Sequence, residues 1–202
     1  MKILAATGNL HKIKEFKSIL NPLGIEFITP QAVGGIPDVE ENGATFEENA
    51  NLKALQTAQF TNMFSFADDS GLEVEALNNA PGIFSSRYAE SDTKRIQRVL
   101  NELSAVEKKT GVKNRNARFV CVIAFASAEK IIATFRGEVY GKITNSPAGS
   151  GGFGYDPIFK PDNFDRSFAQ LLPEEKDSIS HRFNALKKAE EFFKNYIKNY
   201  DV

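Results

Sequence analysis

The sequence predicts an α/β protein with a mixed sheet, and three observations support this fold class. A short apolar strand, Lys2 to Ala6, leads through a glycine turn into an amphipathic helix. Two β-rich runs, Arg118 to Ser127 and Ile131 to Tyr140, flank a short turn and indicate an antiparallel hairpin. Helical patterns are interspersed among these strands, so we expect parallel and antiparallel pairs in one sheet.

The composition is typical of a globular protein, with 42% hydrophobic and 25% charged residues. The 202 residues suffice for one large domain or two closely joined lobes. A formal net charge of -1 does not favour binding to nucleic acid. Cys121 is the only cysteine, which excludes an intramolecular disulfide and is consistent with a reducing cytoplasm. The apolar runs are too short for a signal peptide or a transmembrane helix, so we expect no membrane partner and a cytoplasmic location.

The first strand, turn and helix suggest a phosphate cradle. The turn is Thr7-Gly8-Asn9, and apolar residues at helical spacing follow from Leu10 to Leu20. Free backbone N–H groups and the positive end of a helix dipole attract anions, and Lys12 would add a charge. Any β-α unit can begin this way, and no Walker A motif is present, so the turn alone is weak evidence.

A second strand is expected from Ile25 to Thr29, followed by an acidic loop from Pro30 to Gly43. Glu40 and Glu41 lie near the end of that loop. Thr45 and Glu48 then form the T-x-x-E pattern of a capping box, and the helix should run to about Thr61.

Asn49 and Lys53 are four residues apart and therefore share one face of this helix. They are either a solvated face or, together with a loop glutamate, contacts for a metal and phosphates.

Two aspartates follow the apolar run Phe64 to Ala67, which is typical of a buried strand. We expect the strand to end at Asp68-Asp69-Ser70-Gly71, because Asp, Ser and Gly are depleted in strands. Neighbouring side chains in a strand point to opposite faces, so the two aspartates should have different roles. An ordinary turn would explain this motif in isolation, but carboxylates beside small residues also suit a metal or phosphate site.

The middle of the chain contains a half-exposed strand from Leu72 to Leu77 and a helix from Asp92 to Leu103. Residues Asn101 to Asn116 become polar and predict a surface loop.

A glycine-rich segment, Ser146 to Pro157, formally matches G-x-G-x-x-G. We reject a dinucleotide fingerprint, because no strand leads into it and Asp156-Pro157 follows where a helix should begin. The embedded Phe153 and Tyr155 instead suggest a loop that presents aromatic rings and backbone amides to a base.

Two helical segments should complete the chain. Pro173 to Asp177 predicts a helical turn carrying Lys176, and a helix should follow from His181 to about Asn199. His181 and Arg182 lie in its first turn, where they would meet an anion or a carbonyl oxygen, or simply solvent.

Together these motifs resemble the inosine triphosphate pyrophosphatase family. Six of them occur in order over nearly the whole chain: T-G-N-x-x-K from Thr7, E-x-G-x-T-F-x-E-N-A-x-x-K-A from Glu41, A-D-D-S-G-L from Ala67, P-G-I-x-S-x-R-Y from Pro81, G-G-F-G-Y-D-P from Gly151 and S-H-R-x-x-A-L from Ser180. The departures from the family pattern are Asn42, Glu90, Gln170 and Phe183. None removes a chemical group that the mechanism needs, although Phe183 lies beside the His-Arg pair.

The resemblance implies an elongated, two-lobed single domain with a mixed twisted sheet flanked by helices and an active-site cleft between the lobes. It also implies Mg²⁺-dependent hydrolysis of ITP, dITP or XTP to a monophosphate and pyrophosphate, and a homodimer.

The family motifs also suggest a role for each candidate residue. Glu41 and Asp69 would hold the metal, and Asp69 would activate the attacking water, while the separate roles of Glu40 and Asp68 stay open. The predicted substrate contacts are Thr7, Gly8, Asn9, Leu10, His11, Lys12, Lys53, Ser70 and Lys176 around the phosphates, and Phe153, Gly154, Tyr155, Asp156, His181 and Arg182 around the base. An alternative is a regulatory module that binds a purine nucleotide without cleaving it.

Overall fold

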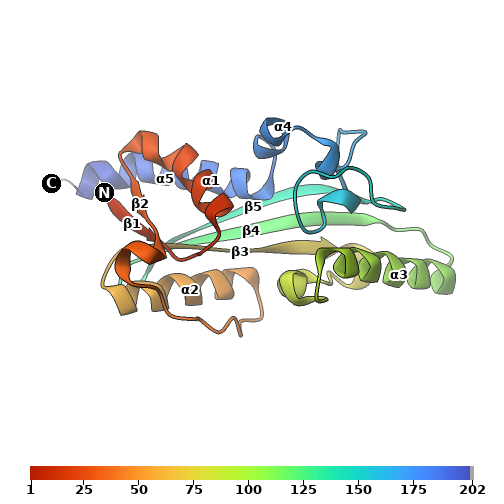
Figure 1. Ribbon diagram of the computed structural model, residues 1–202, viewed down its shortest axis with the longest axis horizontal. Coiled ribbons are helices and arrows are strands. Elements are labelled where there is room, and N and C mark those ends of the chain that lie inside the picture. Colours follow the sequence, from red (N-terminus) through yellow and green to blue (C-terminus); the bar gives the residue numbers. More distant parts are fainter. Residues whose placement is uncertain (201–202) are drawn as a thin grey trace. The chain divides into compact units, whose positions relative to one another are not determined.

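A mixed six-stranded sheet, flanked by helices, organises the computed structural model, which describes residues 1–200 (Figure 1). The strand order is β2-β1-β3-β4-β5-β6. β1 pairs in parallel with β2 and β3, whereas β5 and β6 are antiparallel, so the predicted mixed sheet is confirmed. The strands are β1 (Lys2–Ala5), β2 (Glu26–Ile28), β3 (Ser65–Val74), β4 (Asn116–Ala126), β5 (Ile131–Ile143) and β6 (Phe159–Pro161). The helices are α1 (Leu10–Leu20), α2 (Phe46–Thr61), α3 (Asp92–Thr110), α4 (Pro173–Asp177) and α5 (His181–Tyr200).

The chain divides into two compact units, and β3, β4 and β5 each run through both. Unit 1 comprises residues 1–69, 121–137 and 182 onwards, and unit 2 comprises residues 70–120 and 138–181. None of the described helices is long and apolar enough to cross a membrane.

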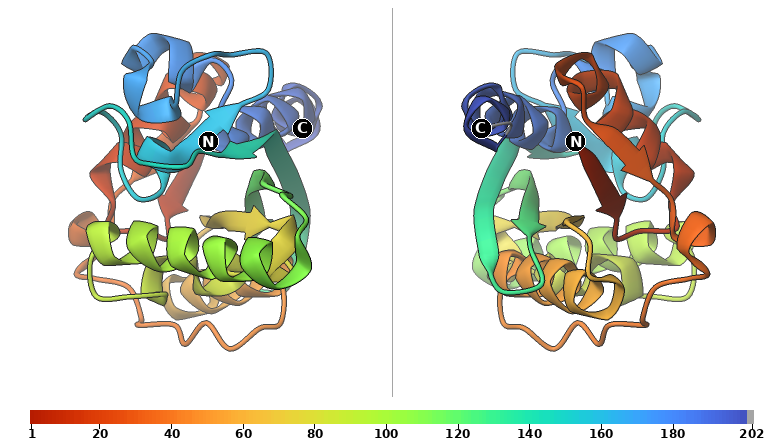
Figure 2. Two further views of the ribbon diagram at one scale, coloured as in Figure 1. Left: turned by 90° about the vertical axis from the view of Figure 1, so that its right-hand side faces the viewer. Right: turned by 90° about the vertical axis from the view of Figure 1, so that its left-hand side faces the viewer.

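Unit 1 is built around the parallel strands β1, β2 and β3. In Figures 1 and 2, α1 and α5 lie on one side of these strands and α2 lies on the other. The core on the α1 and α5 side is rich in phenylalanine: Phe16, Phe66, Phe125 and Phe193 are fully buried. Several of their rings meet edge to face, for example Phe16 and Phe66 at a centroid distance of 5.1 Å. This packing fixes α1 and α5 over the strand that carries the two aspartates.

Unit 2 has its own core, to which α3 contributes Ile96, Val99 and Leu103. Their spacing places one face of α3 against apolar residues of β3 such as Leu72. Phe119 contacts Phe159 in the same core, with ring centroids 4.7 Å apart.

Several boundaries predicted from the sequence are wrong. β3 does not end at Asp68-Asp69-Ser70-Gly71 but continues to Val74, because buried cationic partners, Lys12 and Lys53, balance the charges of the two aspartates within the sheet. The strand expected from Leu72 to Leu77 is the end of β3, which stops at Val74 and is followed by a 3₁₀ turn from Glu75 to Leu77. α3 does not end at Leu103 but continues to Thr110, where Gly111 adopts a left-handed conformation and donates to the carbonyl of Glu107. The polar residues after Leu103 therefore form the exposed face of a helix, not a loop.

Candidate active site

Asp68 and Asp69 are both buried, and they point to opposite faces of β3, as the alternation of side chains in a strand predicts. Asp68 Oδ1 lies 3.0 Å from Lys12 Nζ of α1, and its Oδ2 accepts a hydrogen bond of 3.2 Å from Arg182 Nε of α5. Asp69 instead faces α2. Its Oδ2 accepts from Asn49 Nδ2 at 3.2 Å, and its Oδ1 lies 3.6 Å from Lys53 Nζ.

These different surroundings shift the pKa values of the two carboxyl groups in opposite directions. Burial opposes the ionisation of Asp68, but the charges of Lys12, Arg182 and Lys53 outweigh it and hold its pKa well below the ordinary value. Burial raises the pKa of Asp69, and the nearby Glu41 adds to the rise that Lys53 only partly offsets. Asp68 is therefore a fixed anion, whereas Asp69 is the carboxyl group that can exchange a proton more readily.

Lys53 joins the loop glutamate to the strand. Its Nζ lies 2.8 Å from Glu41 Oε1, and both side chains are largely shielded from solvent. Burial lowers the pKa of Lys53, but Asp69, Asp68 and Glu41 outweigh this effect and raise it. Lys53 thus pairs both with Glu41, twelve residues earlier in the sequence, and with Asp69 of β3.

Asn49 connects the end of the acidic loop to the Asp69 carboxylate. Its Oδ1 accepts from the Gly43 amide at 2.8 Å, while its Nδ2 donates to Asp69. A Cβ at Gly43 would lie 2.7 Å from Glu48 Cβ and 2.8 Å from Asn49 Oδ1, so only glycine permits this close approach. Thr45 caps α2 as predicted, but Glu48 accepts from the Ala44 amide and not from the amide of Thr45.

A cavity of about 400 Å³ in unit 1 brings together several of the predicted phosphate contacts and Glu41, one of the two predicted metal ligands, whereas Asp69 is not among the residues that line it. Its lining includes Thr7, Gly8, Lys12, Glu41, Lys53 and Asp68. An added Cβ at Gly8 would meet no protein atom within 4 Å, and Gly8 does not have a positive φ. The protein's own packing therefore does not require glycine at this position, which leaves its backbone open to a ligand in the cavity.

The rest of the first turn differs in part from the predicted cradle. Asn9 is the N-cap of α1, and its Oδ1 accepts from the amides of His11 and Lys12 at 2.9 and 3.4 Å. These two amides are satisfied within the protein. Leu10 and His11 are exposed and do not line the cavity, and Lys12 is the residue of this turn that supplies a charge.

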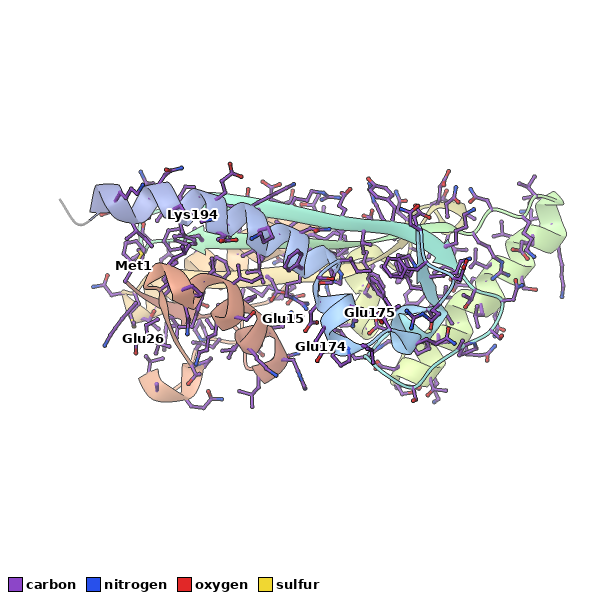
Figure 3. All side chains as sticks on the ribbon, turned by 90° about the horizontal axis from the view of Figure 1, so that it is seen from above. Met1, Glu15, Glu26, Glu174, Glu175 and Lys194 are labelled. Atoms are coloured by element: carbon purple, nitrogen blue, oxygen red, sulfur yellow. The ribbon has the colours of Figure 1, made fainter. Side chains whose placement is uncertain are left out.

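Arg182 is buried, not solvated at the start of α5. Its Nε donates to Asp68, and its Nη1 donates at 2.8 Å to Glu15 of α1, a residue labelled in Figure 3. The two carboxylates raise the pKa of the guanidinium despite its burial. Arg182 thus joins α1, β3 and α5 of unit 1.

Unit 2 contains the glycine-rich segment, where Asp156 is the buried centre of a small network. Asp156 Oδ2 accepts from the Phe153 amide at 2.7 Å and pairs with Lys176 Nζ at 2.5 Å. A Cβ at Gly152, where φ is +72°, would lie 2.1 Å from the same oxygen. Phe153 itself is 57% exposed, with Lys176 Nζ 4.5 Å from its ring centroid. The exposed Phe153 ring of this loop and the Lys176 ammonium group of α4 therefore lie together.

The other predicted base contacts are less accessible. Tyr155 is buried in the core of unit 2, where its hydroxyl donates to the Ser85 carbonyl at 2.9 Å. Burial raises its pKa. The His181 ring is also buried and stacks on Phe119 at 5.0 Å, while the Gly154 amide donates to Asp92 at 2.9 Å. Ser70 follows Asp69 in β3 and is half-buried.

Within residues 1–200, no three His, Cys, Asp or Glu side chains gather closely enough to hold a metal ion by themselves. Glu41 and Asp69 nevertheless fit Mg²⁺, since this ion usually binds one or two carboxylates and completes its shell with waters and substrate phosphates. Both carboxylates contact the Lys53 ammonium, so the pair already accommodates a positive charge.

Sequence reasoning missed Asp38 and Thr57, which line the cavity, and Glu15, which binds Arg182. The only signal for Thr57 was its spacing, since it lies one helical turn after Lys53. Asp38 lies in an irregular loop, and Glu15 lies 167 residues from Arg182, so local pattern did not identify them.

Comparison with known proteins reveals extensive similarity. A family model described as the Ham1 family matches residues 3–192. The chain is 46% identical over 185 residues to a dITP/XTP pyrophosphatase of Prochlorococcus marinus (strain NATL1A), covering 92% of this chain and 90% of the relative. A dITP/XTP pyrophosphatase of Bacillus subtilis (strain 168) is 43% identical over 188 residues, covering 92% and 93%. The solved structure of a HAM1 protein from Coxiella burnetii matches with a TM-score of 0.88 and 41% identity, over 96% of this chain and 98% of that one.

Proposed function

Because this chain belongs to the Ham1 family, we propose that it hydrolyses non-standard purine nucleoside triphosphates, such as ITP, dITP and XTP, to the monophosphate and pyrophosphate. Family membership confirms the resemblance carried by the six sequence motifs. The observation that carries the proposed reaction is that Lys53 pairs with both Asp69 and Glu41 and lines one cavity together with Glu41, Lys12 and Gly8.

The cavity suits the polyphosphate of the substrate. Lys12 and Lys53 offer two ammonium groups, and lysine binds phosphate as a compact point charge. Asp68 is 3.0 Å from Lys12 Nζ and thereby orients that ammonium group at the cavity wall. The backbone at Gly8 adds room for a close approach of phosphate oxygens.

Asp69 is the group best placed to take a proton from the attacking water. Burial raises its pKa in the protein without a bound metal ion, and basicity increases with pKa. The hydrogen bond from Asn49 holds one carboxylate oxygen in place, and Lys53 lies near the other. Losing the proton-accepting group should therefore stop catalysis without removing the phosphate contacts.

We expect Mg²⁺ to be held by Glu41 and Asp69 together with substrate phosphates. When bound, it would neutralise negative charge that develops on the phosphate oxygens. Lys53 contacts both carboxylates and would fix their spacing.

Selection of the base rests on the difference between a 6-oxo and a 6-amino group. Backbone amides, a guanidinium or an imidazole N–H donate to an oxygen but offer no acceptor to an amine. A site with unpaired buried donors rejects the wrong base strongly. Arg182 is already bound to Asp68 and Glu15, so we assign it a positioning role through Asp68, and we assign stacking on the base to the exposed Phe153.

A cytoplasmic homodimer completes the proposal. The single buried cysteine supports the cytoplasmic location. The family resemblance supports the homodimer. Sedimentation equilibrium would test the assembly, and a monomer over a wide concentration range would refute it.

The decisive test measures pyrophosphate release from ITP, XTP, GTP and ATP in the presence of Mg²⁺. We expect kcat/KM to be much higher for ITP and XTP than for ATP, and we expect no orthophosphate. Asp69→Asn serves as the inactive control. Preference for ATP, or tight nucleotide binding without any hydrolysis by the wild type, would contradict the proposed function, and the second result would favour a regulatory nucleotide-binding module.

A further inference from the structure

Unit 2 contains a second cavity, whose lining is strongly basic. It has a volume of about 570 Å³, within the range of small-molecule sites. Four cationic side chains line it, namely Lys113, Arg115, Lys142 and Lys160, together with Thr144 and neighbouring asparagines. No acidic residue is among the described residues that line it.

Within the described part of the chain, Arg115 is the one of these four cations that pairs with a carboxylate. Arg115 Nε donates to Glu107 Oε1 at 2.8 Å, and its Nη1 donates to the Thr144 carbonyl at 2.8 Å. One carboxylate against four cations leaves three positive charges, on Lys113, Lys142 and Lys160. Arg115 therefore holds the wall of the cavity in place, while the lysines are available to a ligand.

Two of the lysines lie side by side on neighbouring strands of the sheet. Lys142 of β5 and Lys160 of β6 are direct partners in the antiparallel register, so their side chains lie on the same face. Like charges directly opposite each other destabilise a sheet. An anion between the two ammonium groups would remove this repulsion.

We propose that this cavity, the Lys142–Lys160 site, binds a small oligophosphate anion. Phosphate oxygens suit lysine ammonium groups, and a ligand with several negative charges matches the three unbalanced cations. The asparagine side chains and Thr144 offer further polar groups for orientation. The site lies in unit 2, whereas the proposed catalytic cavity is lined by residues of unit 1, so the two can be tested separately.

Isothermal titration calorimetry with inorganic tripolyphosphate tests this proposal. The titration uses full-length protein carrying Lys53→Ala, which weakens binding at the catalytic cavity. In this background we expect saturable binding that Lys142→Gln/Lys160→Gln weakens by about tenfold or more, since hydrogen bonds to charged groups have at least this effect. The matched control, Lys2→Gln/Lys130→Gln, removes two exposed charges elsewhere and should leave the affinity within about twofold.

A stability measurement gives an independent readout. Lys142→Gln/Lys160→Gln should raise the Tm of the ligand-free protein, because it relieves the repulsion between the two lysines. The further increase in Tm on adding tripolyphosphate should be smaller for this variant than for the protein that keeps both lysines. The proposal is overturned if the control pair lowers affinity equally, since binding would then reflect general charge alone. Unchanged affinity in Lys142→Gln/Lys160→Gln would overturn it as well. The Lys142→Gln/Lys160→Gln protein with Lys53 intact should hydrolyse ITP normally. A failure of the oligophosphate proposal would therefore leave the proposed hydrolase function unaffected.

Discussion

Asn49 Nδ2 donates a hydrogen bond to Asp69 Oδ2 at 3.2 Å, and both side chains are buried. The same amide group accepts from Gly43, so one side chain of α2 connects the acidic loop with the strand that carries the two aspartates. This relationship fixes the direction of the Asp69 carboxylate before any ligand binds. Preorganised groups of this kind lower the cost of reaching the transition state.

Asp69→Asn should leave the protein folded and lower kcat by about 100-fold or more, because the group that accepts the proton is lost. Burial makes the ionised form of Asp69 unfavourable, so a neutral side chain should leave the Tm at pH 7 equal or higher. Steady-state kinetics at saturating Mg²⁺ and calorimetry check both parts. Retention of more than about a tenth of kcat would be inconsistent with the catalytic role.

Lys53→Ala should lower kcat/KM for ITP by about tenfold or more, because a charge-assisted contact to phosphate is removed. The change also leaves Glu41 and Asp69 without the ammonium group between them. Lys94→Ala is the control, since Lys94 is an exposed lysine paired with Glu90. If both variants retain wild-type kinetics, Lys53 does not bind the substrate.

Gly8→Ala should separate ligand binding from folding. A methyl group at Gly8 meets no protein atom within 4 Å and no backbone strain, so we expect an unchanged Tm. It would occupy space at the cavity wall, and kcat/KM should therefore fall. Gly43→Ala provides the contrast, because its Cβ would clash with Glu48 and Asn49 and should lower the Tm itself. Wild-type kinetics of Gly8→Ala would show that phosphates do not approach this backbone.

Asp68→Asn should destabilise the protein in a pH-dependent way. Removing one partner of a buried ion pair typically costs about 3–5 kcal/mol, and here Arg182 and Lys12 lose their shared anion. The pKa of Asp68 is lower in the folded than in the unfolded protein. Its ionised form therefore contributes fully to the free energy of unfolding above the unfolded-state pKa of 3.8, and this contribution is lost as pH falls towards the folded-state pKa. The difference in unfolding free energy between wild type and variant should thus be constant near neutral pH and shrink below pH 3.8. A difference that is independent of pH down to the acid transition would contradict this assignment.

Local pattern was sufficient for much of the fold. The spacing of Ile13, Phe16 and Leu20 predicted α1, and Thr45 predicted the start of α2, because both features depend on residues within a few positions. The alternation of side chains along a strand also predicted the separate surroundings of Asp68 and Asp69. Helical spacing also predicted that Asn49 and Lys53 share one face of α2, but it did not decide whether that face is solvated or part of a site.

Local pattern did not predict where β3 and α3 end. Asp, Ser and Gly disfavour a strand, yet β3 continues because the ammonium groups of Lys12 and Lys53 balance the buried carboxylates. The polar end of α3 resembled a loop, yet Glu107 near the end of the helix pairs with Arg115 after it, and Gly111 caps it. In both cases tertiary partners outweighed the intrinsic preference of the segment.

The sequence by itself determined most of the elements and the family motifs, because each motif is local and its residues keep fixed spacing. Only the tertiary structure decided how those residues are used. Arg182 lies 114 positions from Asp68, and the fold of unit 1 binds it to that carboxylate, away from solvent. Tyr155 is 70 positions from Ser85, and packing in unit 2 buries its ring where sequence pattern predicted a ligand contact. Burial and long-range ion pairs depend on which segments meet in space, and short-range spacing does not encode that information.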